Sequence, residues 1–207
     1  MKLIIFGATG TVGGHLVHQA IEAGHLVTAF GRNPKKLSIS SHNFRFIVGD
    51  VLNESDVRDA IEGQEAVLCT LGAGRKGVIR SQGTANIIAA MEQRGLKRLI
   101  CQTTLGCGDS EPNLNFFWRH IMFGWFIKEA FKDHQNQESL VINSGLDWTI
   151  VRPSAFTNDT ASHNYRIGFG PDVTDLKLKI SRADVAHFMI NNIQDDTHSL
   201  KTVSISN

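Results

Sequence analysis

Short apolar runs alternate with amphipathic helical patterns along almost the whole chain. Six runs rich in β-branched and aromatic residues lack a strict two-residue alternation, which is typical of strands covered on both faces of a sheet. Strands that alternate with helices in this way indicate a parallel, doubly wound α/β sheet with right-handed crossovers and helices on both faces. The predicted parallel strands span residues 2–6, 26–30, 44–48, 65–70, 97–102 and 147–151.

The segments between these strands carry helix signals at their ends. In residues 11–23, apolar side chains recur every three to four positions, and Gly24 follows as a stop. Asn53 is a candidate N-cap for a short helix that ends at Gly63. Three further helices are predicted: one that ends at Gly95, one that ends at residues 144–145, and one that opens with a capping-box pattern at residues 181–184.

The composition fits one domain of this type, spanning residues 1–207. Of the 207 residues, 42% are apolar and 20% are charged, and the formal net charge is +1, so we expect a full core and no general attraction to nucleic acid. The apolar stretch 116–131 contains four ionisable residues, so no membrane span is predicted. The three cysteines lack a CxxC pattern, which favours free thiols and a cytoplasmic location.

A glycine-rich turn directly follows the first predicted strand and opens the first helix. Glycines let the backbone turn tightly and approach a pyrophosphate, which the free N–H groups at the helix start then bind. This context predicts a dinucleotide site of the Rossmann type, rather than a turn that serves only to reverse the chain. The third glycine is expected to let the helix pack close to the sheet. The residues assigned to this part of the site are Gly7, Thr9, Gly10, Thr11, Val12 and Gly13.

The end of the second predicted strand indicates which dinucleotide binds. NAD sites usually place a carboxylate here, whereas NADP sites place a basic residue that meets the 2′-phosphate. This chain has Arg32 at that point and no carboxylate nearby, and Lys35 or Lys36 can add charge. A guanidinium can bind a phosphate through two parallel hydrogen bonds; a solvated surface arginine is the alternative. We therefore predict NADPH as the cofactor.

Residues at the ends of the later strands complete the predicted site. Asp50 and Val51 follow the third strand, where we expect the adenine edge. Leu71 and Gly72, with Ala73, follow the fourth strand and are expected to face the middle of the cofactor. Thr103 and Thr104 follow the fifth strand, where ligands of α/β folds bind.

Several motifs together resemble the atypical short-chain dehydrogenase/reductases. Within these NAD(P)H-binding, NmrA-like proteins, the chain is most similar to the NADPH-dependent flavin reductase and biliverdin IXβ reductase group. The resemblance spans nearly the whole chain and is weakest at residues 105–133. It rests on GATGTVG at 7–13, GRNPKKL at 31–37, GD at 49–50, SQGTANIIAAM at 81–91, SGLDWTIVRPS at 144–154 and SRADVAHFM at 181–189.

The resemblance implies roles for residues near the nicotinamide. It makes Thr104 a pocket hydroxyl, brings the backbone around Pro153 near the nicotinamide, and turns Ser154 toward the substrate; a plain strand-end threonine and a strand-terminating proline are the alternatives. His134 and Glu138 lie one helical turn apart, where the family has Lys and Glu. His134 is therefore a candidate proton relay near neutral pH, and a solvated helix pair is the alternative.

One departure from the wider family narrows the chemistry. The Tyr-x-x-x-Lys pair of most short-chain dehydrogenases is absent, because the only tyrosine, Tyr165, is followed four residues later by Phe169. Flavins, linear tetrapyrroles and quinones need little protein acid, so we expect an NADPH-dependent reductase of such a planar acceptor. The alternative is a non-catalytic NADP(H) sensor or assembly factor.

The aromatic segment 116–131 has two alternative roles, and one histidine pair is considered as a metal site. Residues 105–109 lack the aromatic side chains that flank the tetrapyrrole in biliverdin IXβ reductases, and the aromatic segment 116–131 is a candidate replacement lid. Alternatively, that segment docks on the core, on a second copy or on a protein partner. His15 and His18 share a helical turn without a third ligand, so no metal is assigned.

Overall fold

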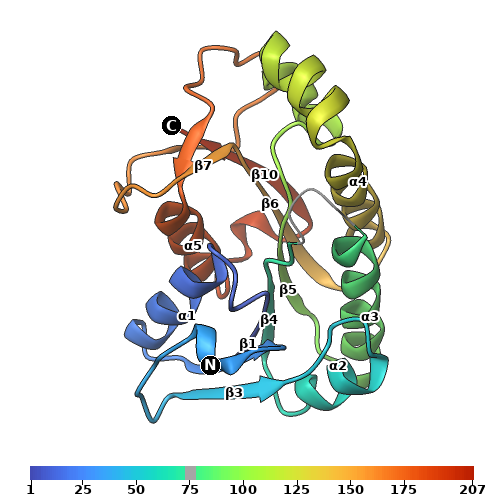
Figure 1. Cartoon of the computed structure of the whole chain (residues 1–207), viewed down its shortest axis with the longest axis vertical. Helices are drawn as coiled ribbons and strands as arrows, with labels where there is room; N and C mark the ends of the chain where they lie inside the picture. Colours follow the sequence, from blue (N-terminus) through green and yellow to red (C-terminus); the bar gives the residue numbers. More distant parts are fainter. Residues whose placement is uncertain (73–77) are drawn as a thin grey trace.

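The computed structural model describes residues 1–72 and 78–207, and the main sheet of the described residues has eight strands. Their order is β3-β2-β1-β4-β5-β6-β10-β8, so the direction of winding reverses between β1 and β4 (Figure 1). The six predicted strands are all present and lie parallel to their neighbours. They are β1 (Lys2–Phe6), β2 (Leu26–Gly31), β3 (Phe44–Val48), β4 (Ala66–Cys69), β5 (Arg98–Gln102) and β6 (Asp147–Pro153). The doubly wound α/β architecture is confirmed.

The prediction of six strands was incomplete. β10 (Lys201–Ser206) pairs in parallel with β6, and the two-residue β8 (Arg166–Ile167) pairs antiparallel with β10. β10 reads KTVSIS, in which two apolar residues are separated by serine, so it lacks a continuous apolar run of the kind seen in β1 and β4. β7 (Ala155–Thr157) and β9 (Lys179–Ser181) form a separate two-stranded sheet.

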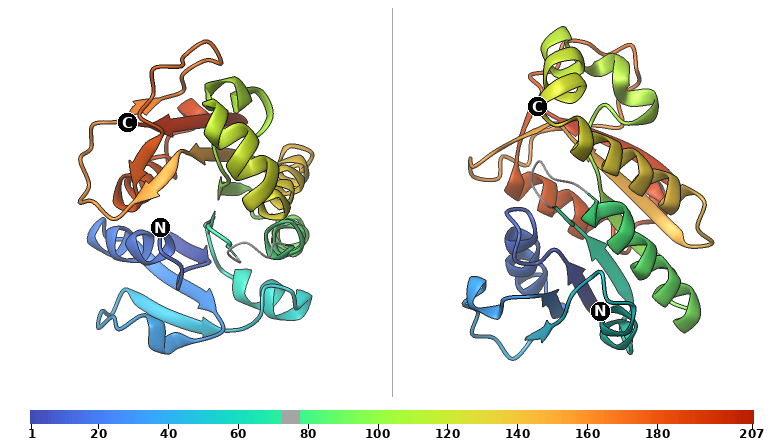
Figure 2. Two further views of the ribbon diagram at one scale, coloured as in Figure 1. Left: turned by 45° about the horizontal axis from the view of Figure 1, so that its top comes forward. Right: turned by 45° about the vertical axis from the view of Figure 1, so that its right-hand side comes forward.

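Helices cover both faces of the sheet. α1 (Gly13–Glu22) and α5 (Arg182–Asn191) pack on one face, whereas α2 (Glu54–Ile61), α3 (Ile79–Arg94) and α4 (Lys128–Ile142) pack on the other (Figures 1 and 2). Their ends follow the predicted signals. The Asn53 side chain accepts a hydrogen bond from the Ser55 N–H at 3.0 Å, Gly95 ends α3 with a φ of 68°, and Ser181 Oγ accepts from the Asp184 N–H at 2.9 Å.

The core has one layer on each side of the sheet. In β1, Leu3 and Ile5 face the layer under α1 and α5, and Ile4 and Phe6 face the layer under α2, α3 and α4. All four side chains are fully buried. Both faces of the strand therefore need apolar residues, which explains its continuous apolar sequence.

The aromatic segment forms a helix at one end of the molecule, above α4 (Figure 1). Residues Phe117–Phe126 adopt a π-helix, and the Ile127 N–H donates to the Met122 carbonyl at 2.9 Å. Phe123 packs in a small third apolar cluster with Leu105, Leu114 and Leu178. No helix in the described part of the chain combines the length and apolar character that a bilayer crossing requires.

Candidate functional site

A cavity of about 550 Å³ lies at the carboxyl ends of the central strands, where the sheet reverses its winding. This is the position at which doubly wound folds bind ligands, and the volume lies in the range typical of small-molecule sites. It is lined by the glycine-rich turn, by residues after β2, β3, β4 and β5, and by Arg80, His134 and Phe156.

The glycine-rich turn has the geometry that a pyrophosphate needs. Gly7 has a φ of 82°, and a Cβ added there would lie 2.5 Å from the Thr70 carbonyl oxygen, so only glycine fits. A Cβ on Gly13 would clash with the backbone of Gly7 and Ala8, so α1 begins in close contact with the turn that follows β1. Among the described residues, the backbone N–H groups of Thr11 and Val12 donate to no protein acceptor. The four residues of this turn that line the cavity beside Gly7 are Thr9, Gly10, Thr11 and Val12.

Two basic side chains that follow β2 in the sequence line one end of the cavity, which is called its basic edge. Arg32 and Lys36 line it, and Lys35 does not. Lys35 belongs to a short 3-10 turn whose start is capped by Asn33, with the Lys35 N–H 3.1 Å from Asn33 Oδ1. Of the two lysines considered from the sequence, this turn therefore brings Lys36 rather than Lys35 to the cavity lining.

The other residues assigned to the cofactor mostly line the same cavity. Asp50, Val51, Leu71, Gly72 and Thr103 all do so; Ala73 lies outside the described residues. The free backbone N–H groups, the glycine cradle and the basic edge together fit a nicotinamide dinucleotide with a 2′-phosphate.

Pro153 is the exception among these assignments. It is the last residue of β6 and lines neither the cofactor cavity nor its neighbour. Its carbonyl accepts from the Leu105 N–H at 2.9 Å, and its Cα pairs with that of Ile205 in β10. Because its backbone is held in the sheet, the structure does not bring it to the site.

A second cavity of about 360 Å³ adjoins the first and is called the acceptor cavity here. The two cavities share the lining residues Arg80, Thr104, His134 and Phe156. The inner side of the π-helix contributes Trp118, Met122 and Phe123 to the acceptor cavity, with Ile127 and Phe131 beyond it. The aromatic segment therefore covers a space that lies next to the cofactor cavity.

Two hydroxyl side chains face this junction from the ends of β5 and β6. Thr104 lines both cavities. Ser154 is 6% exposed and lines the acceptor cavity, and its Oγ has no protein partner among the described residues. A buried hydroxyl without a partner is unfavourable unless a ligand or water bonds it.

Below the junction lies a buried ion pair that replaces the expected solvated helix pair. Glu138 does not pair with His134; its carboxylate accepts from Arg152 Nε at 2.9 Å and Nη2 at 2.7 Å. Thr103 Oγ1 donates to the same carboxylate at 2.6 Å. The pair fixes β6 and the end of β5 relative to α4, and so positions Thr104 and Ser154.

His134 lines both cavities but does not titrate near neutral pH. Burial, together with the positive charge of Arg80, lowers the pKa of His134 to about 3. Its Nδ1 lies 3.3 Å from Gln137 Oε1. The imidazole is therefore neutral at pH 7 and acts there as a hydrogen-bonding group, not as the expected proton relay.

Arg80 and Phe156 are site residues that the sequence did not reveal. Arg80 lies in the first turn of α3, and Phe156 lies in the short strand β7. Neither belongs to a motif, and neither follows one of the six predicted strands directly. The start of α3 is fixed next to α4, because the Asp133 carboxylate accepts hydrogen bonds from the backbone N–H groups of Arg80 and Ser81, at 3.0 Å each. Arg80 lines both cavities from this position.

Tyr165 lies away from the site. Its ring packs against the α1 and α5 core layer, and its hydroxyl lies 3.1 Å from His187 Nδ1. Burial, aided by the negative charge of Asp184, raises the pKa of Tyr165 to about 12. The tyrosine lines neither cavity, so it has no part in proton exchange there.

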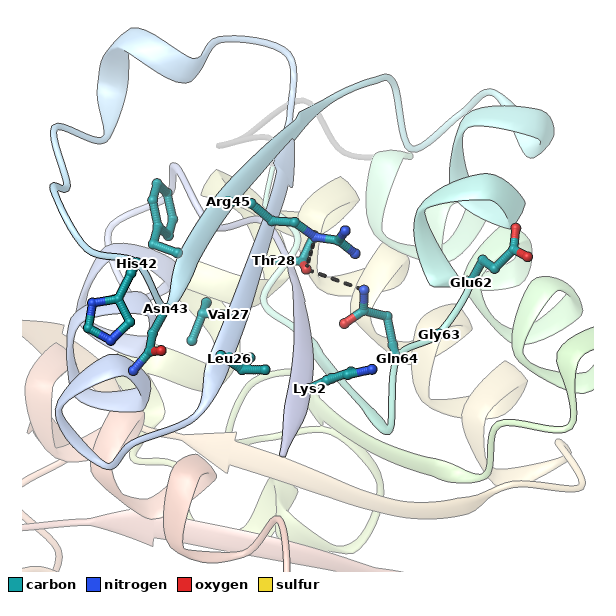
Figure 3. Close-up of a pocket in the computed structure, with 11 residues that line it drawn as sticks. Lys2, Leu26, Val27, Thr28, His42, Asn43, Arg45, Glu62, Gly63 and Gln64 are labelled. Carbon is teal, nitrogen blue, oxygen red and sulfur yellow. Dashed lines mark hydrogen bonds between the residues drawn. The ribbon is translucent and has the colours of Figure 1, made fainter.

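A further cavity of about 320 Å³ lies at the amino ends of β2 and β3. Its polar side chains bond one another: Arg45 Nε and Gln64 Nε2 both donate to Thr28 Oγ1, at 2.8 and 3.2 Å (Figure 3). Ligands of doubly wound folds bind at the opposite ends of the strands. We therefore do not assign this cavity to the cofactor or the acceptor. Within the described residues, no three His, Cys, Asp or Glu side chains are grouped to hold a metal ion.

Comparisons with known proteins find a matching family model and several relatives. A family model described as NAD(P)H-binding matches residues 7–196. The UPF0659 protein YMR090W of Saccharomyces cerevisiae is 27% identical over 224 residues, covering 100% of this chain and 93% of the yeast protein. The photosystem II assembly factor Ycf39 of Synechocystis is 22% identical over 219 residues, which cover 99% of this chain and 62% of that protein.

Solved structures share the fold over the whole chain. The oxidoreductase ylbE of Lactococcus lactis has a TM-score of 0.85 at 22% identity, covering 100% of this chain and 91% of that one. A short-chain dehydrogenase/reductase of Veillonella parvula in complex with NADP has a TM-score of 0.84 at 19% identity, with 100% and 95% covered. ChuY, an anaerobilin reductase of Escherichia coli O157:H7, has a TM-score of 0.83 at 23% identity, with 100% and 97% covered.

Proposed function

The chain belongs to the NAD(P)H-binding family, and from this premise we propose that it is an NADPH-dependent reductase of a planar conjugated acceptor. A flavin is the acceptor we favour, with biliverdin and quinones in the same chemical class. The observation that carries the proposal is the acceptor cavity, which is lined by aromatic side chains and shares Thr104 and His134 with the cofactor cavity. Two adjoining cavities allow a nicotinamide and a flat acceptor to lie in contact.

Each group of residues has a defined task in this reaction. Bound NADPH would supply the hydride, and solvent supplies the one proton that the reduced acceptor also takes up. Arg32 and Lys36 hold the 2′-phosphate. Thr104 and Ser154 donate hydrogen bonds to the acceptor's polar edge, and the aromatic side chains stack on its flat face. The protein therefore mainly orients the reactants.

Turnover with a panel of acceptors tests this function. Protein, NADPH and either riboflavin, FMN, biliverdin or a quinone are mixed, and the loss of absorbance at 340 nm is followed. The proposal expects a rate above the protein-free reaction with at least one of these acceptors. Absence of turnover with every acceptor would exclude the reductase.

Replacing Arg32 with aspartate is expected to remove the preference for NADPH over NADH. Charge-assisted hydrogen bonds to the 2′-phosphate favour NADPH by about ten- to a hundredfold in affinity. In the native chain, NADPH should therefore raise the Tm more than NADH does at equal concentration. Differential scanning fluorimetry measures both shifts, and Arg32→Asp should make them equal or reverse them.

The two neighbouring lysines provide a matched control for this measurement. Lys36→Ser should reduce the NADPH-induced shift because Lys36 lines the cavity, whereas Lys35→Ser should leave it unchanged. Both side chains are exposed, so neither substitution should disturb the fold. An Arg32→Asp protein that still prefers NADPH would show that the 2′-phosphate lies elsewhere.

The outer side of the π-helix supports a second candidate function, a non-catalytic NADP(H) sensor or assembly factor. Phe116 and Trp125 are 72% and 77% exposed, and Phe117, Ile121 and Phe126 are exposed beside them. An apolar surface of this kind is typical of docking sites on a second copy or a protein partner. Ycf39 of Synechocystis, a relative of this chain, is named as an assembly factor. This alternative predicts cofactor binding without turnover.

Two tryptophans of the same helix separate the candidates. Trp118 lines the acceptor cavity, whereas Trp125 points outward. For a reductase, Trp118→Ala should raise the KM for the acceptor by about tenfold through lost stacking, and Trp125→Ala should leave kcat/KM unchanged. A sensor would show no turnover in any of the three proteins. Steady-state kinetics on all three proteins makes the distinction.

The thiols support a reducing compartment, which we propose to be the cytoplasm. Cys69, Cys101 and Cys107 are buried and form no disulfide. Cys69 and Cys101 face each other across β4 and β5 and contact Gln137 as thiols. Three thiols packed in this way fit a protein that folds where cysteines stay reduced.

A further inference from the structure

The acceptor cavity contains two arginines and no acidic side chain among the described residues that line it. Arg80 enters it from α3, on one face of the sheet, and Arg182 enters it from α5, on the other face. The rest of the lining is apolar apart from Thr104, His134 and Ser154. Of these two cations, Arg80 has the Asp133 carboxylate as a partner outside the cavity, and no carboxylate of the described residues pairs with Arg182.

Arg80 is buried and incompletely paired. It is 7% exposed, and its Nε has no hydrogen-bond partner among the described residues. The nearest carboxylate, Asp133, lies 3.5 Å from Nη1. That carboxylate already accepts from two backbone N–H groups at the start of α3 and from Ser81 Oγ at 2.6 Å. Arg80 therefore keeps unused donors at the junction of the two cavities.

Arg182 is held by neutral groups only. Its Nη1 donates to the Thr157 carbonyl at 2.9 Å and to Asn158 Oδ1 at 2.8 Å, and its guanidinium lies 5.2 Å from the centre of the Phe156 ring. Its Nε is buried without a partner, and no carboxylate of the described residues lies within ion-pair distance. These contacts fix the half-buried guanidinium in place without a carboxylate partner among the described residues.

We propose that Arg80 and Arg182 form an anion subsite that binds a carboxylate or phosphate carried by the planar acceptor. The inference rests on the proposed function and makes it more specific: the substrate is a flat conjugated molecule with an anionic substituent. Guanidinium groups suit both anions, because each presents planar pairs of donors that match two oxygens. The apolar lining holds the conjugated body, and the arginines select its charged end.

The two arginines differ in what else they can bind. Arg80 also lines the cofactor cavity, so its charge is shared between cofactor and acceptor. Arg182 lines the acceptor cavity and not the cofactor cavity. Changing Arg182 therefore tests the anion subsite without disturbing cofactor binding.

Matched pairs of ligands test the subsite by binding. FMN and riboflavin share one ring system and differ by a phosphate; biliverdin and its dimethyl ester differ by two carboxylates. Dissociation constants are measured without NADPH, by quenching of flavin fluorescence and by the absorbance change of the tetrapyrroles. The native protein should bind the anionic member of at least one pair about tenfold more tightly than the neutral one. The pair that shows the difference identifies phosphate or carboxylate as the anion.

Variants of Arg182 complete the test. Arg182→Gln keeps hydrogen-bond donors for Thr157 and Asn158 but removes the charge, and it should abolish the preference while leaving the neutral ligand's affinity within about twofold. Arg182→Lys should retain part of the preference. Arg94→Leu, at the exposed far end of α3, controls for net charge and should change nothing. Melting temperatures confirm that each variant folds.

The outcomes of this inference and of the proposed function are separable. Equal affinity for both members of both pairs, or a preference that survives Arg182→Gln, would overturn the anion subsite even if turnover is found. A preference that Arg182→Gln abolishes, without NADPH oxidation, would support the subsite and exclude the reductase. NADPH-induced stabilisation should be the same in native and Arg182→Gln proteins.

Discussion

Replacing Arg152 with methionine is expected to lower the free energy of unfolding by about 3–5 kcal/mol. The guanidinium is 3% exposed and makes two hydrogen bonds to Glu138, which is 4% exposed. Methionine fills a similar volume but leaves the Glu138 carboxylate buried without a positive partner. A buried charge without a partner destabilises the folded state strongly. Chemical denaturation of both proteins measures the difference.

Two variants control for this interpretation. Arg166→Met removes an exposed pair with Asp175 and should change stability by less than about 1 kcal/mol. Adding Glu138→Gln to Arg152→Met removes the stranded charge and should restore part of the lost stability. A loss for Arg152→Met no larger than that for Arg166→Met would show that the buried pair does not hold the end of β6 in place.

Replacing Gly13 with alanine is expected to destabilise the chain by about 3 kcal/mol and to abolish NADPH-induced stabilisation. The new Cβ would lie 2.8 Å from the Ala8 Cα and closer still to the Gly7 carbonyl oxygen. These are backbone atoms of the glycine-rich turn, and they cannot yield as a flexible side chain does. Either α1 or the glycine-rich turn must move. Each movement would displace the backbone N–H groups that are expected to bind the pyrophosphate.

The next residue offers a control that is almost identical in sequence. A Cβ on Gly14 would meet nothing within 4 Å, so Gly14→Ala should be neutral or stabilise the helix by up to about 1 kcal/mol. Denaturation curves and thermal shifts with NADPH are recorded for both variants. Equal behaviour of the two variants would mean that close packing at Gly13 does not shape the cofactor turn.

The fold was predictable because its signals are local and repeated. The strands β1 and β4 are almost entirely apolar, because both faces of the sheet are covered by helices there, whereas the edge strand β3 reads FRFIV and has no buried residue. The cofactor turn was predictable because its signal is also local. Residues Gly7 to Gly13 connect the end of β1 directly to the start of α1, and the spacing of their glycines is visible in the sequence. β10 escaped prediction because KTVSIS alternates polar and apolar residues and carries no motif.

The acceptor side of the site could not be found in this way because it depends on long-range contacts. Arg80 and Arg182 are 102 positions apart in the sequence. They line the same cavity because α3 and α5 both begin at the carboxyl ends of the parallel strands. The neutral state of His134 depends on its burial beside Arg80. The two sides of the π-helix are equally aromatic in sequence. They differ only in their tertiary contacts, because Phe123 packs in an apolar cluster and Trp125 is exposed to solvent.

Direct hydride transfer at the junction of the two cavities is the central claim, and an anaerobic single-turnover measurement tests it most directly. Protein saturated with NADPH is mixed with FMN in a stopped-flow instrument, and absorbance is followed at 340 and 450 nm. We predict that NADPH is consumed and the flavin bleached with the same rate constant, well above that of the protein-free mixture. FMN that binds but is not reduced faster than without protein would contradict the claim.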